Sequence, residues 1–469
     1  MIPEFVVLLV GVGLTWLIAL RIRSPKTKQL LFLIASYAFY ASFGRWFIGI
    51  LVGSTIANYF YGIFLRRKPT VARLAGGAAL NLLLLSFFKY FPELLADLHH
   101  TPAAVAWVSS IALPIGISFW TFQALSYLFD IYRGEELVPS FLEFCLYMGF
   151  GPTVLSGPIC RIGDLVPQFR AGATPKRTDI TGGLQRIWLG MFMMKLARLL
   201  GAGVASGHGL DAAFQLAPGT LGALDVWVLA IGYGLQLFFD FAGYSHIVIG
   251  LARCFGFRLP ENFDNPYLST TPASFWTKWH MSLSFWIRDY VFLPLASIKR
   301  QLWWRYISLI IAMAAFGIWH RGKLTFLLWG TYQGVLLVLH RIWQSLQRRF
   351  QFQWKGAGAT FVSWAVTFSA MCLGWLFFRS EDAERAFGLL RNAFSWSHMH
   401  EYALTPDLYG LIGLFFAGYF LIAGLWILAQ RENEVFSWIP MELRVACYVA
   451  MSYIIVRPSQ PQPFIYFQF

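Results

Sequence analysis

Long apolar segments recur along the whole chain, separated by short polar connections. Each segment approaches the about 20 residues that a helix needs to cross the hydrocarbon core of a bilayer. The pattern predicts roughly a dozen membrane elements. They lie at residues 2–20, 30–65 (two short helices that fold back), 74–91, 105–129, 141–160, 184–204, 221–251, 281–295, 306–319, 324–340, 361–378, 411–428 and 445–456.

Composition supports this interpretation. Of 469 residues, 57% are hydrophobic and 13% are charged, about half the charged share of a soluble domain. The first apolar segment has no basic residues before it and no small-residue cleavage site after it, so we expect a retained helix rather than a signal peptide. The five cysteines are scattered without metal-ligand or redox spacing, so we expect packing roles and no metal site.

The net charge of +14 could suggest a nucleic-acid partner, but its distribution argues for a membrane topology. Lysine and arginine gather in short segments at 21–28, 66–73, 161–177, 299–305 and 341–355, whereas the connections 92–104 and 205–220 contain neither. Residues 379–407 are mildly acidic. This asymmetry follows the positive-inside rule. It places the basic segments in the cytoplasm and the N-terminus outside it, and it leaves no expected nucleic-acid partner.

If the basic segments all lie on the cytoplasmic side of the membrane, the elements 141–160 and 281–295 must each begin and end on the same side of the membrane. Such re-entrant elements occur where protein or a water-filled cavity satisfies the backbone, and they often mark a site. On the outer side, 379–394 predicts an amphipathic helix with Ala383, Phe387, Leu390 and Phe394 on one stripe. The stripe suits either the membrane surface or a docking partner. The aromatic tail 463–469 is expected at the outer interface.

Ionisable side chains inside a membrane are costly, so each one suggests a functional hypothesis. His320 closes the run 306–319, and a polar break separates it from the run 324–340. Arms of about 14 and 17 residues give about 21–25 Å of helix, which places the apex of this hairpin within the membrane. A buried neutral imidazole there can accept a proton from an alcohol, although a structural helix-end histidine fits the same pattern.

Other histidines allow weaker inferences. His280 lies at the mouth of the re-entrant segment 281–295 and is a second catalytic candidate. His246 follows Asp240 and Tyr244 on an apolar helix and favours an internal hydrogen-bonding role. His340 ends a helix, where a cation complements the helix dipole. Neither a Ser-His-Asp triad, nor a phosphate-binding loop, nor a metal cluster can be assembled from the sequence.

Several motifs together resemble one family. The central stretch reads Pro-Glu-Asn-Phe-Asp-Asn-Pro-Tyr-Leu at 260–268, Ser-Phe-Trp-Thr-Lys-Trp-His-Met-Ser-Leu-Ser at 274–284 and Trp-Ile-Arg-Asp-Tyr at 286–290. Supporting motifs lie at 113–123, 130–134, 157–161, 240–245 and 464–469. Over nearly its whole length the chain resembles the membrane-bound O-acyltransferase family, and within it the bacterial alginate-type polysaccharide O-acetyltransferases. The resemblance implies one all-helical membrane domain over 1–469, arranged around a central channel.

The same resemblance assigns candidate site residues. The essential histidine of the family lies in a Gly-x-Trp-His element, here residues 317–320, which makes His320 the catalytic residue; the second family histidine falls on His280. The family usually continues with Gly and Ala, whereas this chain has Arg321, Gly322 and Lys323. This difference concerns how the acceptor is held more than which donor is used. Residues expected to bind substrate are Trp279, Lys278, Asn262, Asp240, Tyr244, Arg288, Trp319 and Arg161.

The implied activity is transfer of an acetyl group from cytosolic acetyl-CoA toward an extracytoplasmic polysaccharide. His320 would be the general base and His280 would polarise the thioester. Acetyl-CoA is the expected donor, with no bound cofactor. Expected partners are an extracytoplasmic acetyltransferase or acetyl-acceptor protein, the polysaccharide synthesis and export machinery, and the lipid of a bacterial inner membrane.

Three alternatives stay open at this stage. A D-alanyl transferase of the same family would take its acyl group from a carrier protein. A transporter for lipid-linked sugars would show paired intramembrane charges and internal repeats, and the sequence has neither. An inactive export-complex scaffold would not need His280 and His320.

Overall fold

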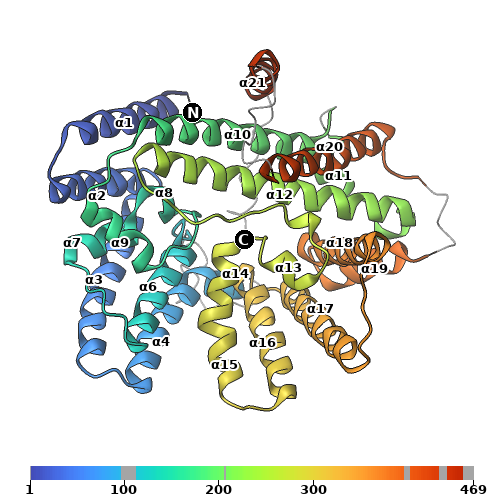
Figure 1. Ribbon diagram of the computed structural model, residues 1–469, viewed down its shortest axis with the longest axis horizontal. Coiled ribbons are helices and arrows are strands. Elements are labelled where there is room, and N and C mark those ends of the chain that lie inside the picture. The colour runs from blue at the N-terminus through green and yellow to red at the C-terminus, as the bar shows by residue number, and fades with distance from the viewer. Residues whose placement is uncertain (1, 97–111, 205–206, 396–401, 432–440, 458–469) are drawn as a thin grey trace. The chain divides into compact units, whose positions relative to one another are not determined.

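Helices form over the apolar segments that the sequence pattern singled out (Figure 1). The structure, a computed structural model, describes residues 2–96, 112–204, 207–395, 402–431 and 441–457. Within these ranges the chain is helical, and its only strand-like pairing is a single bridge between Phe263 and Trp279. The expected all-α fold is confirmed. The aromatic tail 463–469 and His99, His100, His398 and His400 lie outside the described residues.

The first eleven helices precede the central signature region: α1 (Ile2–Arg21), α2 (Pro25–Ala41), α3 (Arg45–Arg67), α4 (Val71–Lys89), α5 (Phe91–Ala96), α6 (Ile117–Tyr132), α7 (Phe141–Gly149), α8 (Gly151–Val154), α9 (Ile162–Ala171), α10 (Arg177–Ala202) and α11 (Leu210–Ala213). The remaining elements are the 3₁₀ turns η2 (Pro218–Thr220) and η3 (Pro266–Leu268), the π turn η4 (Arg288–Phe292), and α12 (Ala223–Cys254), α13 (Pro272–Trp276), α14 (Met281–Ile287), α15 (Leu293–Ser297), α16 (Leu302–His320), α17 (Leu324–Arg349), α18 (Ala357–Arg379), α19 (Ala383–Ala393), α20 (Pro406–Arg431) and α21 (Met441–Val456).

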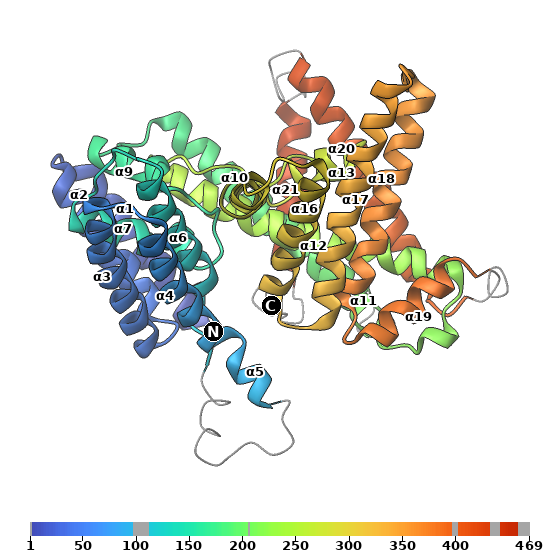
Figure 2. The ribbon, with the colours of Figure 1, turned by 90° about the horizontal axis from the view of Figure 1, so that it is seen from below.

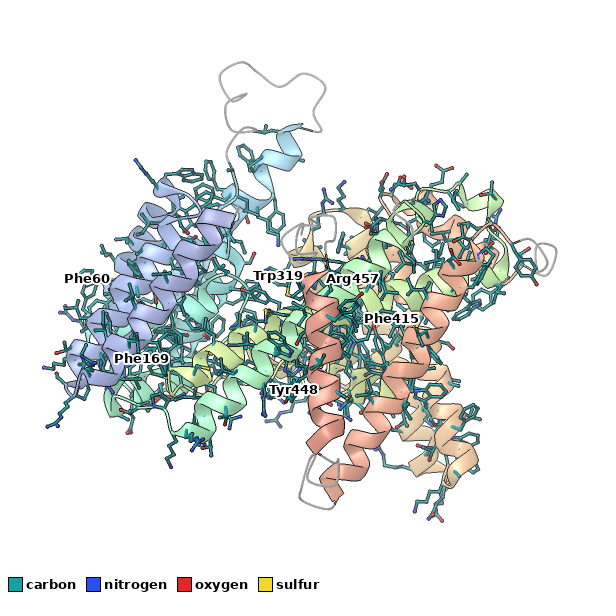
Figure 3. All side chains as sticks on the ribbon, turned by 90° about the horizontal axis from the view of Figure 1, so that it is seen from above. Phe60, Phe169, Trp319, Phe415, Tyr448 and Arg457 are labelled. Carbon is teal, nitrogen blue, oxygen red and sulfur yellow. The ribbon has the colours of Figure 1, made fainter. Side chains whose placement is uncertain are left out.

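Six helices in the described part are long and apolar enough to cross a membrane. They are α3, α4, α12, α16, α18 and residues 406–424 of α20. Their outward side chains suit lipid: Figure 3 shows the ring of Phe60 projecting from α3, and 61% of this side chain is exposed. By contrast, Phe169 of α9 is buried. The chain is therefore a multi-pass membrane protein.

Two predicted lengths were wrong. The segment 30–65 does form two helices, but α3 has 23 residues and is long enough to span rather than short. In the hairpin whose first arm ends at His320, the two helices have 19 and 26 residues instead of the predicted lengths of about 14 and 17. Because α16 begins at Leu302, before Trp303 and Trp304, its length no longer requires an apex inside the membrane.

The two predicted re-entrant segments are broken into short pieces. Residues 141–160 contain α7, with nine residues, and α8, with four, separated at Phe150 before Pro152. Residues 281–297 form α14, the π turn and α15 in sequence. Neither segment is among the six candidate spans. The re-entrant interpretation of both segments stays a prediction.

The chain contacts divide into two compact units, which we describe separately. Unit 1 comprises residues 1–188 and 245–261, and unit 2 comprises residues 189–244 and 262–469. Two of the three boundaries fall inside α10 and α12, so each of these continuous helices contributes to both units, and the third follows residue 261 in the connection after α12. The single domain over 1–469 stays a prediction.

Unit 1 packs around α6 and α7. Thirteen of the sixteen residues of α6 are buried, and the neighbouring α3 and α4 pack against it (Figure 2). A helix that is buried on all sides is a core helix rather than a lipid-facing one. Asn58 of α3 and Asn81 of α4 exchange side-chain hydrogen bonds of 3.0 and 2.8 Å. These buried amides therefore satisfy each other.

Polar contacts also fix the ends of α7 and α9. Glu143 accepts hydrogen bonds from the backbone of Ser140 and from Arg170, at 2.7 and 2.9 Å. Burial opposes ionisation of Glu143, but the hydrogen bonds from Arg170 and Ser140 outweigh it and lower the pKa of this carboxyl. The ammonium of Lys28 on α2 is buried and donates to the carbonyls of Gly172 and Ala173 and to the Thr174 hydroxyl.

Unit 2 is built on the antiparallel hairpin α16–α17, with α18 packed along α17 (Figure 2). The hairpin brings together the start of α16 and the end of α17, and both are flanked by basic residues at 299–305 and 341–355. The sequence analysis assigned both basic segments to one side of the membrane. Their shared end of the hairpin agrees with that assignment.

The amphipathic segment forms α19, and a face other than the predicted stripe packs against the protein. Ala386, Leu389 and Ala393 are buried, whereas 53% of Phe387 and 64% of Phe394 are exposed. Small residues on the inner face allow α19 to pack closely against η2. The predicted aromatic stripe is therefore the face left for lipid or for a partner.

Candidate active site

His320 is the last residue of α16 and is only 4% exposed. The centroid of its ring lies 4.8 Å from that of Trp319 and 4.9 Å from that of Phe316, both on the same helix. Trp329 of α17 lies 5.4 Å away, and Phe378 of α18 lies 5.2 Å away. Aromatic rings from three helices thus separate the imidazole from bulk water.

Glycine permits the close helix crossing that forms this enclosure. A Cβ added at Gly317 would stand 2.1 Å from the carbonyl oxygen of Phe326 and 3.1 Å from the Cα of Gly330. A Cβ at Gly330 would stand 2.2 Å from the carbonyl oxygen of Met313. The α16 and α17 backbones therefore touch one turn from His320, in the manner of small-residue contacts between membrane helices.

His280 is 1% exposed and has a left-handed backbone conformation, with φ 43° and ψ 54°, just before α14. For a residue with a side chain this conformation costs about 1–2 kcal/mol. Such residues persist where the surroundings determine them, and they cluster at functional sites. The rings of His280 and of Phe241 from α12 are nearly perpendicular, at 84°, with centroids 4.6 Å apart.

Asn262 supports the turn at His280. The backbone nitrogen of Met281 donates to the Asn262 carbonyl at 2.9 Å, and the Ser282 hydroxyl donates to the Asn262 side-chain oxygen at 2.6 Å. The backbone nitrogen of Asp264 donates to the Lys278 carbonyl at 3.0 Å. This short antiparallel pairing holds the chain on both sides of His280, so Asn262 positions the histidine in the structure.

One series of ring contacts runs between the two histidines. Trp279, beside His280, lies 5.0 Å from Trp375 of α18, and Trp375 lies 6.0 Å from Trp329. Trp329 in turn contacts His320. His280 and His320, forty residues apart in sequence, therefore border one aromatic cluster within unit 2.

The other predicted site residues have varied surroundings. Asp240 is buried and Tyr244 is half-buried, both on α12. The guanidinium of Arg288 forms an ion pair with Asp289 at 2.7 Å and lies 4.8 Å from the centroid of Phe285. Its side chain is 54% exposed, so Arg288 is engaged locally. Arg161 belongs to unit 1, where its backbone nitrogen donates to Asp164 at 2.7 Å.

Four residues in and beside this aromatic cluster were not predicted from the sequence: Trp329, Gln333, Trp375 and Phe378. One signal was available, because Gln333 is a polar residue in an apolar segment of a predicted membrane helix. It follows Trp329 by one helical turn on the same face of α17. The aromatic contacts of Trp375 and Phe378 depend on how the helices pack, and the sequence alone contains no signal that predicts them.

Several buried polar atoms in this region have no hydrogen-bond partner among the residues that the structure describes. They are the indole nitrogens of Trp276 and Trp329 and both amide atoms of Gln333. Burying such a group unpaired costs about 1–3 kcal/mol. Trp276 and Trp329 are themselves neighbours, with centroids 6.0 Å apart. Trp329 contacts His320, and these unpartnered atoms gather around Trp329, so this part of unit 2 is suited to bind a polar ligand.

These features define a multi-pass membrane protein with two buried imidazoles beside one aromatic cluster. The family model named MBOAT, membrane-bound O-acyltransferase family, matches residues 90–379, which include both histidines. The chain belongs to the membrane-bound O-acyltransferase family.

Similar proteins carry acyltransferase names. The chain is 32% identical over 412 residues to a probable alginate O-acetylase of Pseudomonas aeruginosa, covering 84% of this chain and 74% of that protein. It is 28% identical over 405 residues to the peptidoglycan O-acetyltransferase of Helicobacter pylori, covering 79% and 74%. It is 31% identical over 288 residues to the teichoic acid D-alanyltransferase of Streptococcus thermophilus, covering 58% and 67%. The chain is therefore a membrane O-acyltransferase.

Proposed function

We propose that this enzyme transfers an acetyl group from cytosolic acetyl-CoA across a bacterial inner membrane toward an extracytoplasmic polysaccharide, directly or through a partner protein. The observation that carries the proposal is the placement of His280 and His320 at one buried aromatic cluster, within the region matched by the family. Similarity to an alginate O-acetylase and a peptidoglycan O-acetyltransferase supports acetyl transfer to a glycan.

In the proposed reaction, His320 takes the proton of the acceptor hydroxyl as its oxygen attacks the thioester carbonyl. A carbon–oxygen bond forms and the carbon–sulfur bond breaks. The departing coenzyme A thiolate then takes a proton from the imidazolium, which restores His320. His280 polarises the thioester carbonyl as the negative charge develops on its oxygen. Asn262 positions His280 through the turn that it supports.

Positive charge supports entry of the donor from the cytoplasmic side. An anionic coenzyme is attracted to basic surfaces. Arg161 lies in the basic segment 161–177, and Lys278 ends the connection 255–278, which we also assign to the cytoplasm. Within unit 1, part of each segment meets the other: Gln168 donates to the Arg258 carbonyl at 2.9 Å and accepts from the Arg258 nitrogen at 2.8 Å. We propose that Trp279, Trp319, Asp240, Tyr244 and Arg288 contribute to the substrate path. This topology places the N-terminus outside the cytoplasm.

Transfer through a partner would need a surface on the outer side. The exposed stripe of α19, with Phe387 and Phe394, is a candidate contact for an acetyl-acceptor protein or for the polysaccharide export machinery. Its aromatic side chains suit a protein interface. The membrane surface is the alternative occupant of the same stripe.

A donor assay tests the proposal. Purified enzyme in detergent is offered acetyl-CoA or D-alanyl carrier protein, and release of the free thiol is measured. We expect thiol release from acetyl-CoA that depends on His320. Activity with the D-alanyl carrier alone would contradict the acetyl assignment and would support the alternative suggested by the similarity to teichoic acid D-alanyltransferases.

A further inference from the structure

Several buried side-chain amides elsewhere in the described part of the chain have partners, although the amide oxygens of Gln123 and Gln236 have none. Asn58 and Asn81 pair with each other, and Gln29 of α2 donates to the Phe169 carbonyl at 3.0 Å. These contacts join neighbouring helices, which is the usual role of an amide inside a membrane protein. These amides show how a side-chain amide with a purely structural role is hydrogen-bonded in this protein.

Gln333 differs from these amides. The residue is 0% exposed, yet neither its amide oxygen nor its amide nitrogen has a hydrogen-bond partner in the described part of the chain. The amide nitrogen lies against Gly374 of α18, where an added Cβ would stand 2.6 Å from it. A helix contact therefore holds the carboxamide in place without satisfying it.

The neighbouring unpartnered groups restrict the chemistry of a ligand. Trp276 and Trp329 each have a buried indole nitrogen without a partner, and an indole N–H can only donate. Gln333 can donate and accept. A matching ligand therefore offers acceptor oxygens, such as carbonyl oxygens, together with at least one N–H or O–H. A chain of secondary amides has this composition, whereas a hydrocarbon or a simple ester does not.

We propose that Gln333 binds the pantetheine arm of the acyl donor by accepting a hydrogen bond from its first amide N–H, while the indoles of Trp329 and Trp276 donate to its carbonyl groups. This proposal rests on the proposed function, because it takes a thioester of a pantetheine carrier as the donor. It assigns a donor-binding residue to the reaction in addition to the two histidines.

The spacing along α17 agrees with this assignment. Trp329 contacts His320, and Gln333 follows Trp329 by four residues, which is about 6 Å along a helix axis. In pantetheine, a two-carbon spacer separates the thioester sulfur from the first amide nitrogen, a comparable span. With the thioester carbonyl at His320, the first amide reaches the level of Gln333.

The position of Gln333 along α17 indicates whether it lies on the donor side or the acceptor side of His320. From Trp329 to Gln333 the helix runs away from the His320 end and toward its basic end at Arg348 and Arg349. The proposed function places that end in the cytoplasm, where the donor enters. A hydroxyl of the polysaccharide approaches from the opposite end, so Gln333 lies on the donor side of His320.

Two small donors test the proposal. One is S-acetyl-N-acetylcysteamine, which keeps the first amide of pantetheine, and the other is its ester counterpart, in which oxygen replaces the amide N–H. We expect the wild-type enzyme to use the amide donor about tenfold better in kcat/KM, the size of one hydrogen bond. We expect Gln333→Met, a change of similar volume, to abolish this preference by slowing the amide donor alone. Gln29→Met is the matched control, and it should keep the wild-type preference.

Other outcomes overturn the proposal. Equal use of both donors by the wild-type enzyme means that the amide is not recognised. An equal loss with both donors in Gln333→Met means that Gln333 is structural, and a change in the KM of the glycan alone assigns it to the acceptor. If Gln333→Met does not accumulate, the thermal unfolding temperature of the wild-type enzyme is measured with unreactive thioether analogues of the two donors. Equal stabilisation by both analogues also overturns the proposal.

Failure of the proposed function can be distinguished from failure of the Gln333 assignment. An enzyme that rejects acetyl donors but accepts D-alanyl thioesters contradicts acetyl transfer. The same pair of amide and ester donors, carrying D-alanyl groups, then tests Gln333 in that reaction, because a carrier protein also presents its acyl group on pantetheine. Loss of the amide preference in Gln333→Met would support the assignment in either reaction.

Discussion

Gly317 of α16 lies directly against the backbone of α17, so that a Cβ at this position would stand 2.1 Å from the carbonyl oxygen of Phe326. A rigid backbone atom, rather than a flexible side chain, blocks the space. The spacing of the two helices is therefore fixed within one turn of His320. Any side chain at position 317 must separate α16 from α17 or move the end of α16.

Gly317→Ala should destabilise the protein and reduce acyl transfer together. Overpacking of this kind costs about 1–3 kcal/mol, and the displaced helix carries His320. Thermal unfolding in detergent and the rate of thiol release measure the two effects. Gly413→Ala is the matched control, because Gly413 lies in α20 with no other atom within 4 Å of an added Cβ. If both variants had the unfolding temperature and activity of the wild type, the close contact between the α16 and α17 backbones would be contradicted.

His320→Ala should abolish acyl transfer while leaving the protein folded in the membrane. General base catalysis contributes about 10²–10⁴-fold, so less than a few per cent of the activity should remain. His340→Ala, which removes a half-buried histidine from α17, should retain activity. The initial rate is compared at matched amounts of protein that elute as one species. Substantial activity of His320→Ala would exclude the general-base role.

His280 allows the imidazole and the backbone to be tested separately. His280→Ala and His280→Gly both remove the ring and should both lose transfer activity. The glycine variant should be more stable than the alanine variant by about 1 kcal/mol, because only glycine adopts the left-handed conformation at φ 43° without cost. Unfolding temperatures measured side by side test this order. Recovery of activity in His280→Gly would mean that the turn matters and the ring does not.

Charge reversal tests where the donor enters. Arg161→Glu and Lys278→Glu should weaken the apparent affinity for acetyl-CoA, and the effect should shrink as salt is raised because screening weakens the attraction. The KM for acetyl-CoA is measured at low and moderate salt. Arg391→Glu, on the exposed face of α19, is the control on the predicted outer side and should leave the KM unchanged. If only Arg391→Glu changed the KM for acetyl-CoA, the proposed orientation of the protein in the membrane would have to be reversed.

The Glu143–Arg170 pair should make stability depend on pH. Hydrogen bonds lower the pKa of Glu143 in the folded protein, so the pair stabilises the fold above the unfolded pKa near 4.5. That contribution is lost as the pH falls through the lower, folded pKa. At neutral pH, Glu143→Gln should cost about 1.5–3 kcal/mol, the value of hydrogen bonds to a charged group. Unfolding temperatures of both proteins from pH 7 to pH 3 should converge; parallel curves would contradict the assignment.

The apolar pattern predicted the helices well because lipid requires continuous apolar sequence and internal backbone hydrogen bonding. It placed the start of α16 too late, since Trp303, Trp304 and Arg305 read as a polar connection although they form the first turn of the helix. It also singled out Phe387 and Phe394 of α19, which the structure leaves exposed. It did not predict the face that packs against the protein, because that face includes the small residues Ala386 and Ala393.

The candidate site was predictable only in part. A local motif points to His320, and family resemblance adds His280. The contacts of Trp329 and Trp375 arise from the packing of α17 and α18 against segments far away in sequence. Gln333 could have been singled out by its polarity, but its lack of partners is a property of the folded chain. Tertiary packing, rather than local sequence, defines this part of the site.

The buried ammonium of Lys28 has a practical consequence for an enzyme whose proposed donor is an activated thioester. Acetyl-CoA slowly modifies accessible lysines without catalysis, but three oxygen acceptors occupy and cover this amine. Lys26, two residues earlier, is exposed on the same helix. A small amine-reactive reagent should therefore mark Lys26 and spare Lys28 until α2 separates from the end of α9. The ratio of the two labels in one peptide gives an internal gauge of whether a preparation in detergent has kept its fold.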